Sequence, residues 1–304
     1  MDTINTMGTN SAQFELLIIG GGNMGGAIAR ACAANGRAVV VVEPNVSAAQ
    51  RLIELEKEPN KEPNKVQDQA RAQTRTLKVV STLHEGLGLC AQTATVVLAV
   101  KPQIFTSVVP ELAQACVARL VVSIMAGVTT AGIEAMMPRA RVVRSMPNLG
   151  AFIGMSMTAL SAGASASRED VAMARGVLAT FGEVVEIDES LMDAFTAVAG
   201  SGPAFAFYLA EAMVLGACEV GFEVRESRRI VAKTLDAAAR LLAGAADESQ
   251  ETCTFDAAAW RARVTSKDGT THAAVESLAA SGVREAIVDA VVAARDRGRE
   301  LGTG

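Results

Sequence analysis

A polar stretch near the carboxyl end has the residue types best suited to binding an anion. Val264–His272 reads Val-Thr-Ser-Lys-Asp-Gly-Thr-Thr-His and lies between two alanine-rich apolar segments. Hydroxyl residues and a glycine before an amphipathic run are typical of a loop that leads into a helix N-terminus. Such an end presents unpaired backbone N–H groups and a partial positive charge, which favour an anion. Taken alone, the stretch fits an ordinary helix cap better than a binding site.

A second candidate site lies near the amino end. The apolar run Glu15–Ile19 precedes the loop Gly20–Gly26, and helix-forming residues follow it. The loop fits G-x-G-x-x-G in the strand–loop–helix context that this motif requires. Its first glycine permits a tight turn, its second lets a pyrophosphate approach the backbone, and its third lets helix and strand pack closely. The predicted cofactor contacts in this loop are Gly20, Gly22, Asn23, Met24 and Gly25.

The residues after the next apolar run bear on the choice of dinucleotide. Ala38–Val42 predicts a buried strand that ends at Glu43. An acidic residue there usually binds the ribose hydroxyls of the adenosine and disfavours a 2′-phosphate, which points to NAD. Asn45 and Ser47 follow and can donate hydrogen bonds to a phosphate, and Glu43 can equally face solvent. Both NADPH and NADH therefore stay open.

Three later segments place small or polar residues just past predicted strands, where this architecture binds its ligand. Lys101 and Pro102 follow the run Thr95–Val100, and Lys101 is either a phosphate contact or a solvated lysine. Ala126-Gly127 follows another run. Asn148 follows a third, where it either binds a nicotinamide or holds a turn.

These elements predict an α/β chain with a Rossmann-type, doubly wound and mostly parallel sheet, followed by an all-helical part. Residues 155–161 and 182–187 look like a closing strand pair around a helix over 167–180. The predicted domains are a disordered tail at 1–13, a dinucleotide-binding domain at 14–188 with a KEPN-containing surface insertion at 57–76, and a helical dimerisation and substrate domain at 189–304.

One helix of the second part is apolar on nearly every side. Ala204–Cys218 has a single charge, at Glu211, so we expect it in a core or, preferably, in an oligomer interface. No apolar run approaches the ~20 residues of a membrane helix. The net charge of −5, without basic clusters, disfavours nucleic acid. Five scattered cysteines indicate reduced thiols in a cytoplasm, and two unrelated histidines give no metal site.

An ordered set of short motifs makes the chain resemble the pyrroline-5-carboxylate reductases, from about Glu15 to Leu301. The motifs are the glycine loop, Ala99-Val-Lys-Pro102, Ala126-Gly-Val128, Arg144-Ser-Met-Pro-Asn148, Gly200-Ser-Gly-Pro203 with Glu211-Ala212, and Val264-Thr-Ser-Lys-Asp-Gly-Thr-Thr271. The last segment is the most specific. The chain departs from the family in its KEPN insertion and at Lys267-Asp268, where members usually have Pro-Gly or Lys-Gly. The carboxylate of Asp268 puts a negative charge beside the expected anion site.

The resemblance implies an NADPH-dependent enzyme, with NADH used less often, that interlocks as a homodimer through its helical domain and often assembles into decamers. It also implies a small-molecule substrate whose carboxylate and ring nitrogen are held by Ser266, Gly269, Thr270 and Thr271, with Thr271 the catalytic residue. The cofactor cleft that it implies includes Val100, Lys101, Pro102, Ala126, Gly127 and Asn148, together with Glu43 and Asn45.

The expected reaction is hydride transfer to C5 of a cyclic imine, which needs placement and charge complementarity more than acid catalysis. A 3-hydroxyacid dehydrogenase is a rival, but those enzymes use a Lys with a nearby Asn on a second-domain helix. This chain has no Asn after Asn148, and Lys233 is the only lysine in the helices predicted for its second part. A non-catalytic dinucleotide-binding sensor is the other alternative, because the glycine loop alone allows it.

Overall fold

The computed structural model describes residues 14–57, 76–117, 119–246 and 257–302. They form two compact units: unit 1 is Met1–Gly200 with Arg295–Gly304, and unit 2 is Ser201–Ala294. The two compact units divide after Gly200, and the last part of the chain groups with unit 1. The expected tail at 1–13 and the insertion residues 58–75 lie outside the described residues.

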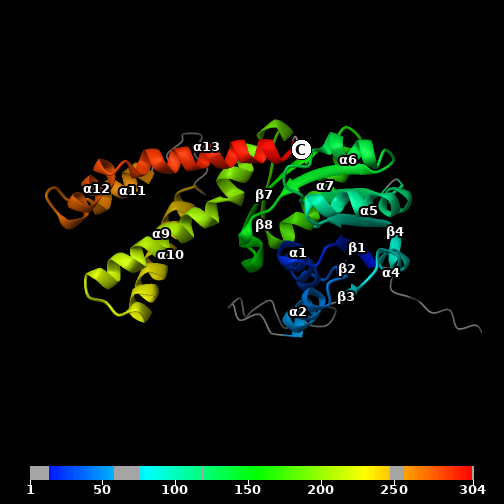
Figure 1. The fold of residues 1–304 in the computed structure, drawn as a ribbon, viewed down its shortest axis with the longest axis horizontal. Helices are drawn as coiled ribbons and strands as arrows, with labels where there is room; N and C mark the ends of the chain where they lie inside the picture. The colour runs from blue at the N-terminus through cyan, green and yellow to red at the C-terminus, as the bar shows by residue number, and fades with distance from the viewer. Residues whose placement is uncertain (1–13, 58–75, 118, 247–256, 303–304) are drawn as a thin grey trace, which may run out of the picture. The chain divides into compact units, whose positions relative to one another are not determined.

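Unit 1 is built on an eight-stranded sheet in the order β3-β2-β1-β4-β5-β6-β7-β8 (Figure 1). The strands are β1 (Phe14–Ile19), β2 (Ala38–Val42), β3 (Thr76–Val80), β4 (Cys90–Leu98), β5 (Leu120–Ser123), β6 (Arg141–Met146), β7 (Ser156–Ala162) and β8 (Gly182–Glu186). All neighbours are parallel except β6 and β7. Because β7 and β8 are joined by a helix, they pair in parallel, and the mostly parallel sheet predicted from the sequence is confirmed.

Alternate side chains of the strands enter two separate cores, one on each face of the sheet. Leu16 and Ile18 of β1 lie in the core under α1, α2 and α7, whereas Leu17 and Ile19 lie in the core under α4, α5 and α6. This is the two-residue periodicity of a strand that is buried on both faces. The helices of the first face are α1 (Asn23–Ala34), α2 (Val46–Lys57) and α7 (Arg168–Leu178), and those of the second are α4 (Leu83–Leu89), α5 (Pro102–Ala115) and α6 (Thr130–Met136).

Short helical turns carry the chain from β8 to the end of the first part of unit 1. They are η3 (Glu189–Leu191), α8 (Met192–Phe195) and a π-helical turn, η4 (Thr196–Gly200). Helical spacing in the sequence over 191–200 predicts a helix, and the structure divides this segment into three short turns. A π turn widens the backbone ring by one residue and leaves a carbonyl free for another partner. Here that partner is the side-chain amide of Asn148, which donates to the Ala199 carbonyl.

Unit 2 is helical throughout its described residues. Its helices are α9 (Gly202–Glu219), α10 (Val224–Ala246), α11 (Ala257–Val264), α12 (Thr270–Ala280) and the first part of α13 (Val283–Gly302). Its described core is small: Ser227 and Val231 of α10 are buried, whereas no residue of α9 is. Large apolar side chains on α9 therefore face outward, among them Phe207, Tyr208 and Leu215.

One helical stretch, Glu189–Glu219, is long and apolar enough to cross a membrane by length and composition alone, with a mean hydropathy of 1.4 over its most apolar window. The expectation that no run approaches this length is therefore wrong. The stretch passes the test because small and apolar residues continue across the π turn and the Gly200-Ser201-Gly202 break into α9. Such a surface needs a cover, which a second protein subunit supplies as readily as a lipid does.

Candidate active site

The strands adjacent to β1 end in one row, and this row fixes where ligand-binding residues can gather. Ile19 of β1 is in register with Val42 of β2 and with Leu98 of β4, and Leu98 is in register with Ser123 of β5. The carboxyl ends of these parallel strands therefore open onto the same edge of the sheet. Ligands of open α/β sheets bind at this edge.

The glycine loop has the backbone geometry that its motif predicts. Gly20 adopts a φ of +102°, and a Cβ on it would lie 2.8 Å from the Ala99 carbonyl oxygen. A side chain on Gly25 would collide with the carbonyl of Gly20, so the third glycine permits the close packing of α1 on the loop. Nothing lies near a Cβ placed on Gly22, and Gly22 and Asn23 are exposed.

The first turn of α1 is open to an anion. Gly22 occupies the N-cap position, where no side chain caps the helix, and the first turn has no acidic residue. The backbone N–H groups from Asn23 to Gly25, including that of half-buried Met24, begin the helix at this point. Uncapped N–H groups beside a glycine that leaves open space are what a pyrophosphate requires, so these residues fit a dinucleotide.

Glu43 does not simply face solvent. One carboxylate oxygen, Oε2, accepts the Gly21 N–H at 2.8 Å, and the other, Oε1, accepts the Asn45 N–H at 2.8 Å. The Asn45 side-chain oxygen in turn accepts the Ala48 N–H at 2.9 Å and so caps the start of α2. Glu43 therefore ties the glycine loop to the β2–α2 connection, a role that its place in the sequence does not reveal.

The other residues assigned to the cleft lie past β4 and β5. Val100 is half-buried, exposed Lys101 takes the N-cap position of α5 without a capping bond, and Pro102 is the first residue of that helix. Ala126 is exposed. Gly127 has a φ of +75°, and a Cβ on it would lie 3.1 Å from the Leu301 carbonyl carbon, so its neighbour within unit 1 is the end of α13.

Asn148 holds a turn, which is one of the two roles that the sequence leaves open for it. Its Oδ1 accepts the Gly150 N–H at 3.0 Å, and its Nδ2 donates to the Ala199 carbonyl at 3.0 Å. Ala199 lies in the π turn, so the amide of Asn148 binds a carbonyl of that turn. Asn148 thus joins the end of β6 to the last turn before unit 2.

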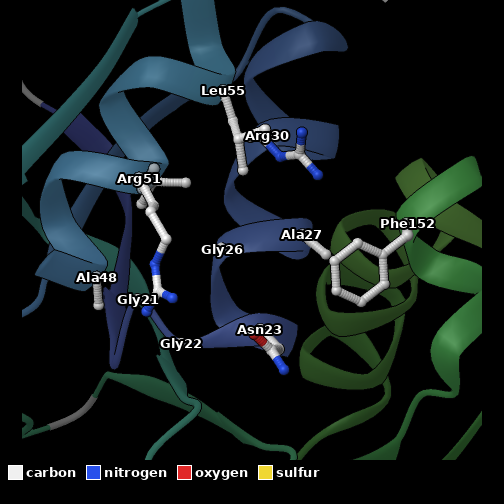
Figure 2. A pocket seen from close by; sticks show the side chains of 11 residues that line it. Gly21, Gly22, Asn23, Gly26, Ala27, Arg30, Ala48, Arg51, Leu55 and Phe152 are labelled. Atoms are coloured by element: carbon white, nitrogen blue, oxygen red, sulfur yellow. The ribbon is translucent and has the colours of Figure 1, made fainter.

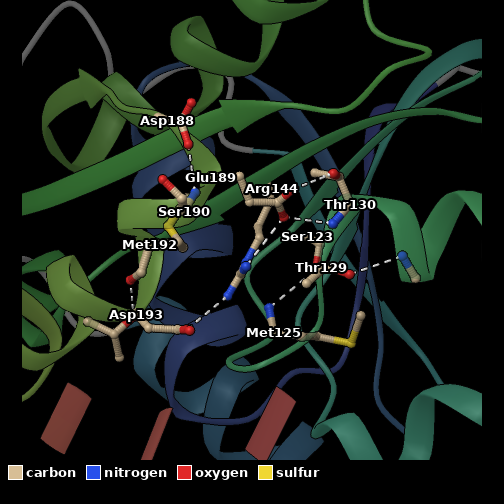
Figure 3. Close-up of polar contacts among 12 residues, drawn as sticks. Ser123, Met125, Thr129, Thr130, Arg144, Asp188, Glu189, Ser190, Met192 and Asp193 are labelled. Atoms are coloured by element: carbon tan, nitrogen blue, oxygen red, sulfur yellow. Dashed lines mark hydrogen bonds and ion pairs between the residues drawn. The ribbon is translucent and has the colours of Figure 1, made fainter. Parts of the chain in front are cut away.

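A buried ion-pair cluster lies beside this turn and cannot be found from local sequence patterns (Figure 3). The guanidinium of Arg144, which is only 3% exposed, lies 3.3 Å from a Glu189 oxygen and 3.6 Å from an Asp193 oxygen. Glu189 also accepts the backbone N–H of Thr130 at 2.7 Å and its hydroxyl at 2.6 Å. The cluster fixes η3 and α8 to β6 and α6. Arg144, a charged residue in the buried strand β6, is the one signal of it in the sequence.

The polar stretch of unit 2 forms a tight turn that leads into α12. The Ser266 carbonyl accepts the Gly269 N–H at 3.1 Å, and Gly269 is the N-cap residue of α12, which no side chain caps. A Cβ on Gly269 would collide with the Ser266 hydroxyl in its present position, so the glycine lets that hydroxyl lie close to the start of α12. Ser266 and Thr270 are exposed and Thr271 is half-buried. The helix start that the sequence predicts after this loop is therefore present, and no side chain caps it.

Asp268 occupies a backbone position that favours glycine. Its φ is 59°, the only positive φ of a non-glycine residue among those the structure describes. Aspartate tolerates this left-handed region better than most residues because its short side chain can hydrogen-bond locally. The conformation gives a physical reason for the glycine that the resemblance leads us to expect here, and for why an aspartate is accepted.

Comparisons with known proteins match both parts of the chain. A family model described as pyrroline-5-carboxylate reductase dimerisation covers residues 189–301, and one described as NADP oxidoreductase, coenzyme F420-dependent, covers residues 15–127. The pyrroline-5-carboxylate reductase of Mycobacterium tuberculosis is 32% identical over 94% of this chain and 96% of its own. That of Synechocystis is 38% identical over 67% of this chain and 74% of its own.

Solved structures agree with these matches. The pyrroline-5-carboxylate reductase of Coxiella burnetii superposes with a TM-score of 0.76 at 27% identity and covers 95% of this chain and 98% of its own. The Plasmodium falciparum enzyme, solved with NADP bound, shares the fold at a TM-score of 0.76, with 22% identity over 95% of this chain and 98% of its own.

The fold and the open helix start at the glycine loop define an NAD(P)H-dependent oxidoreductase with a Rossmann domain and a helical dimerisation domain. The extent of the matches is decisive for the family. The chain belongs to the pyrroline-5-carboxylate reductase family.

Proposed function

We propose that the chain reduces 1-pyrroline-5-carboxylate to L-proline, the last step of proline biosynthesis, with NADPH and, less effectively, NADH. The observation that carries the proposal is the Ser266–Thr271 turn, whose helix start lacks a side-chain cap. A small carboxylate is the natural ligand of such a start. The hydroxyl and N–H groups of this turn suit a substrate that is already electrophilic as a protonated imine and needs placement more than acid catalysis.

We assign the binding of the substrate and the binding of the dinucleotide to two separate sets of residues. A bound reduced nicotinamide supplies a hydride, which adds to C5 while the C=N π electrons move to the nitrogen. The N–H groups of Thr270 and Thr271 and the hydroxyl of Ser266 bind the substrate carboxylate. The Thr271 hydroxyl hydrogen-bonds the ring nitrogen as it changes from imine to amine. The start of α1 and the cleft residues beyond β4 and β5 hold the dinucleotide.

The same proposal covers assembly. The exposed apolar residues of α9 lie within the region that the dimerisation model matches, so we propose a homodimer formed through α9. A decamer is the expectation that family resemblance adds. The thiols of Cys32, Cys90, Cys116 and Cys218 are free, in agreement with a reducing cytoplasm as the place of action.

An assay with two substrates tests the function. The purified chain should oxidise NADPH with 1-pyrroline-5-carboxylate and should not reduce NAD⁺ with a 3-hydroxyacid. Lys233, which the dehydrogenase alternative needs in a site, has a side chain 79% exposed and paired with Asp236 at 3.0 Å on the surface of α10. Bound dinucleotide without turnover on either substrate would favour the sensor alternative.

A further inference from the structure

Coenzyme choice in this chain is not explained by Glu43 alone. Both oxygens of its carboxylate accept main-chain N–H groups, from Gly21 and from Asn45, each at 2.8 Å. These bonds hold the carboxylate in place at the end of β2, where a negative charge opposes a 2′-phosphate. A chain that takes NADPH here needs a cation to offset it.

A groove between α1 and α2 supplies two cations next to the glycine loop. Gly21 and Gly22 line one end of it, and Arg51 of α2 and Arg30 of α1 contribute its positive charge. Figure 2 shows the two side chains pointing differently: the Arg51 guanidinium reaches down toward Gly21, whereas the Arg30 guanidinium lies at the far end of the groove, away from the loop. Gly21 is also the residue whose N–H binds the Glu43 carboxylate.

Helix geometry explains the direction of Arg51. Side chains of an α-helix lean toward its N-terminus, so an arginine in the second turn of α2 covers the turn before it. Ala48, three residues earlier, also lines the groove and is too small to block the path. Within the described part of the chain, the Arg51 guanidinium forms no ion pair, so it can receive an external anion.

We propose that Arg51 receives the 2′-phosphate of NADPH and is the residue that sets the coenzyme preference against the opposing charge of Glu43. A guanidinium binds a phosphate through two parallel hydrogen bonds, which a ribose hydroxyl cannot replace. Arg51 therefore contributes to NADPH binding and little to NADH binding. The inference rests on the proposed function, because it concerns the dinucleotide site of that reaction.

The test measures binding without the reaction. Isothermal titration calorimetry on the purified oligomer compares adenosine 2′,5′-bisphosphate with adenosine 5′-monophosphate for the wild type, Arg51→Gln and, as the matched control in the same groove, Arg30→Gln. Arg51→Gln should weaken binding of the bisphosphate by about tenfold or more and leave binding of the monophosphate within about twofold of the wild type. Arg30→Gln should weaken bisphosphate binding less. The ratio of kcat/KM for NADPH to that for NADH should fall by a similar factor.

Three results would overturn the inference: an equal loss for both ligands, an unchanged preference, or the same loss in Arg30→Gln. A wild type that prefers the monophosphate would overturn it as well. Failure of the proposed function looks different, because the wild type would then make no proline with either coenzyme. If proline forms with NADH in Arg51→Gln at the wild-type rate, the function stands and the binding ratio alone decides the role of Arg51.

Discussion

Replacing Arg144 with methionine should destabilise unit 1, because among the described residues this side chain is the only cation of the cluster with Glu189 and Asp193. Its guanidinium lies 3.3 Å from Glu189 and 3.6 Å from Asp193 while only 3% of the side chain is exposed. Removing one partner of a fully buried ion pair costs about 3–5 kcal/mol, since the remaining charge is left without compensation. Methionine keeps most of the volume, so the change tests the charge.

For Arg144→Met we expect a smaller loss in the free energy of unfolding than the value for a fully buried ion pair. The carboxylates of Glu189 and Asp193 are 27% and 26% exposed, so water can partly solvate them when Arg144 is absent. Glu189 also keeps its two bonds from Thr130. We therefore expect a loss of about 2 kcal/mol in the free energy of unfolding, or about 4–8 °C in the melting temperature of a domain of this size.

Urea unfolding at one fixed protomer concentration measures this, because assembly also contributes to stability. Arg175→Met is the control: its ion pair with Glu186 has the same 3.3 Å separation but is exposed, and its Nη1 also donates to the Val184 carbonyl at 2.7 Å, so the loss should stay below that at Arg144. Arg144→Met combined with Glu189→Gln should cost less than the sum of the two single changes. Equal losses at Arg144 and Arg175, or strict additivity, would refute the reasoning.

Four further predictions concern other parts of the chain. Asp268→Gly should leave stability within about 0.5 kcal/mol, because relief of the left-handed conformation offsets glycine entropy, and it should lower the KM for the substrate by removing a negative charge; a higher KM would contradict this. Thr271→Ala should reduce turnover about 10- to 100-fold with unchanged coenzyme affinity, and an equal loss of both would mean a structural role. Ala206→Glu or Ala210→Glu should give monomers or unfolded protein in light scattering, and an oligomer of wild-type size would count against the α9 interface. Burial raises the pKa of the Cys32 thiol to about 11, which leaves ~0.1% thiolate at pH 8, so iodoacetamide should label it only after unfolding; rapid labelling of the native protein would disprove its burial.

The sequence predicts the sheet well because its signals are local. Five consecutive apolar residues make β2, and a glycine loop between an apolar run and helix formers makes the start of α1. Helices whose local sequence signals are weak are not predicted. Leu83–Leu89 contains two glycines in seven residues, yet it forms α4 because Thr82 caps it and Leu83 is buried.

The roles of individual site residues depend on contacts between distant segments, which composition and spacing do not reveal. The partner of Arg144 lies 45 residues away, and Asn148 reaches Ala199 51 residues further along the chain. Asp268 stood out in the sequence for its charge, whereas its backbone φ of 59° is what the structure adds. The sign of φ at one residue follows from the surrounding turn and cannot be read from the residue type alone.

The most direct test of the proposed function follows the transferred atom. The purified enzyme is incubated with 1-pyrroline-5-carboxylate and NADPH carrying deuterium at the reactive C4 position, and the product is analysed by mass spectrometry and NMR. We predict one equivalent of L-proline for each NADPH oxidised, with the deuterium on C5. Coenzyme oxidation without proline, or proline without deuterium at C5, would contradict the function that we propose.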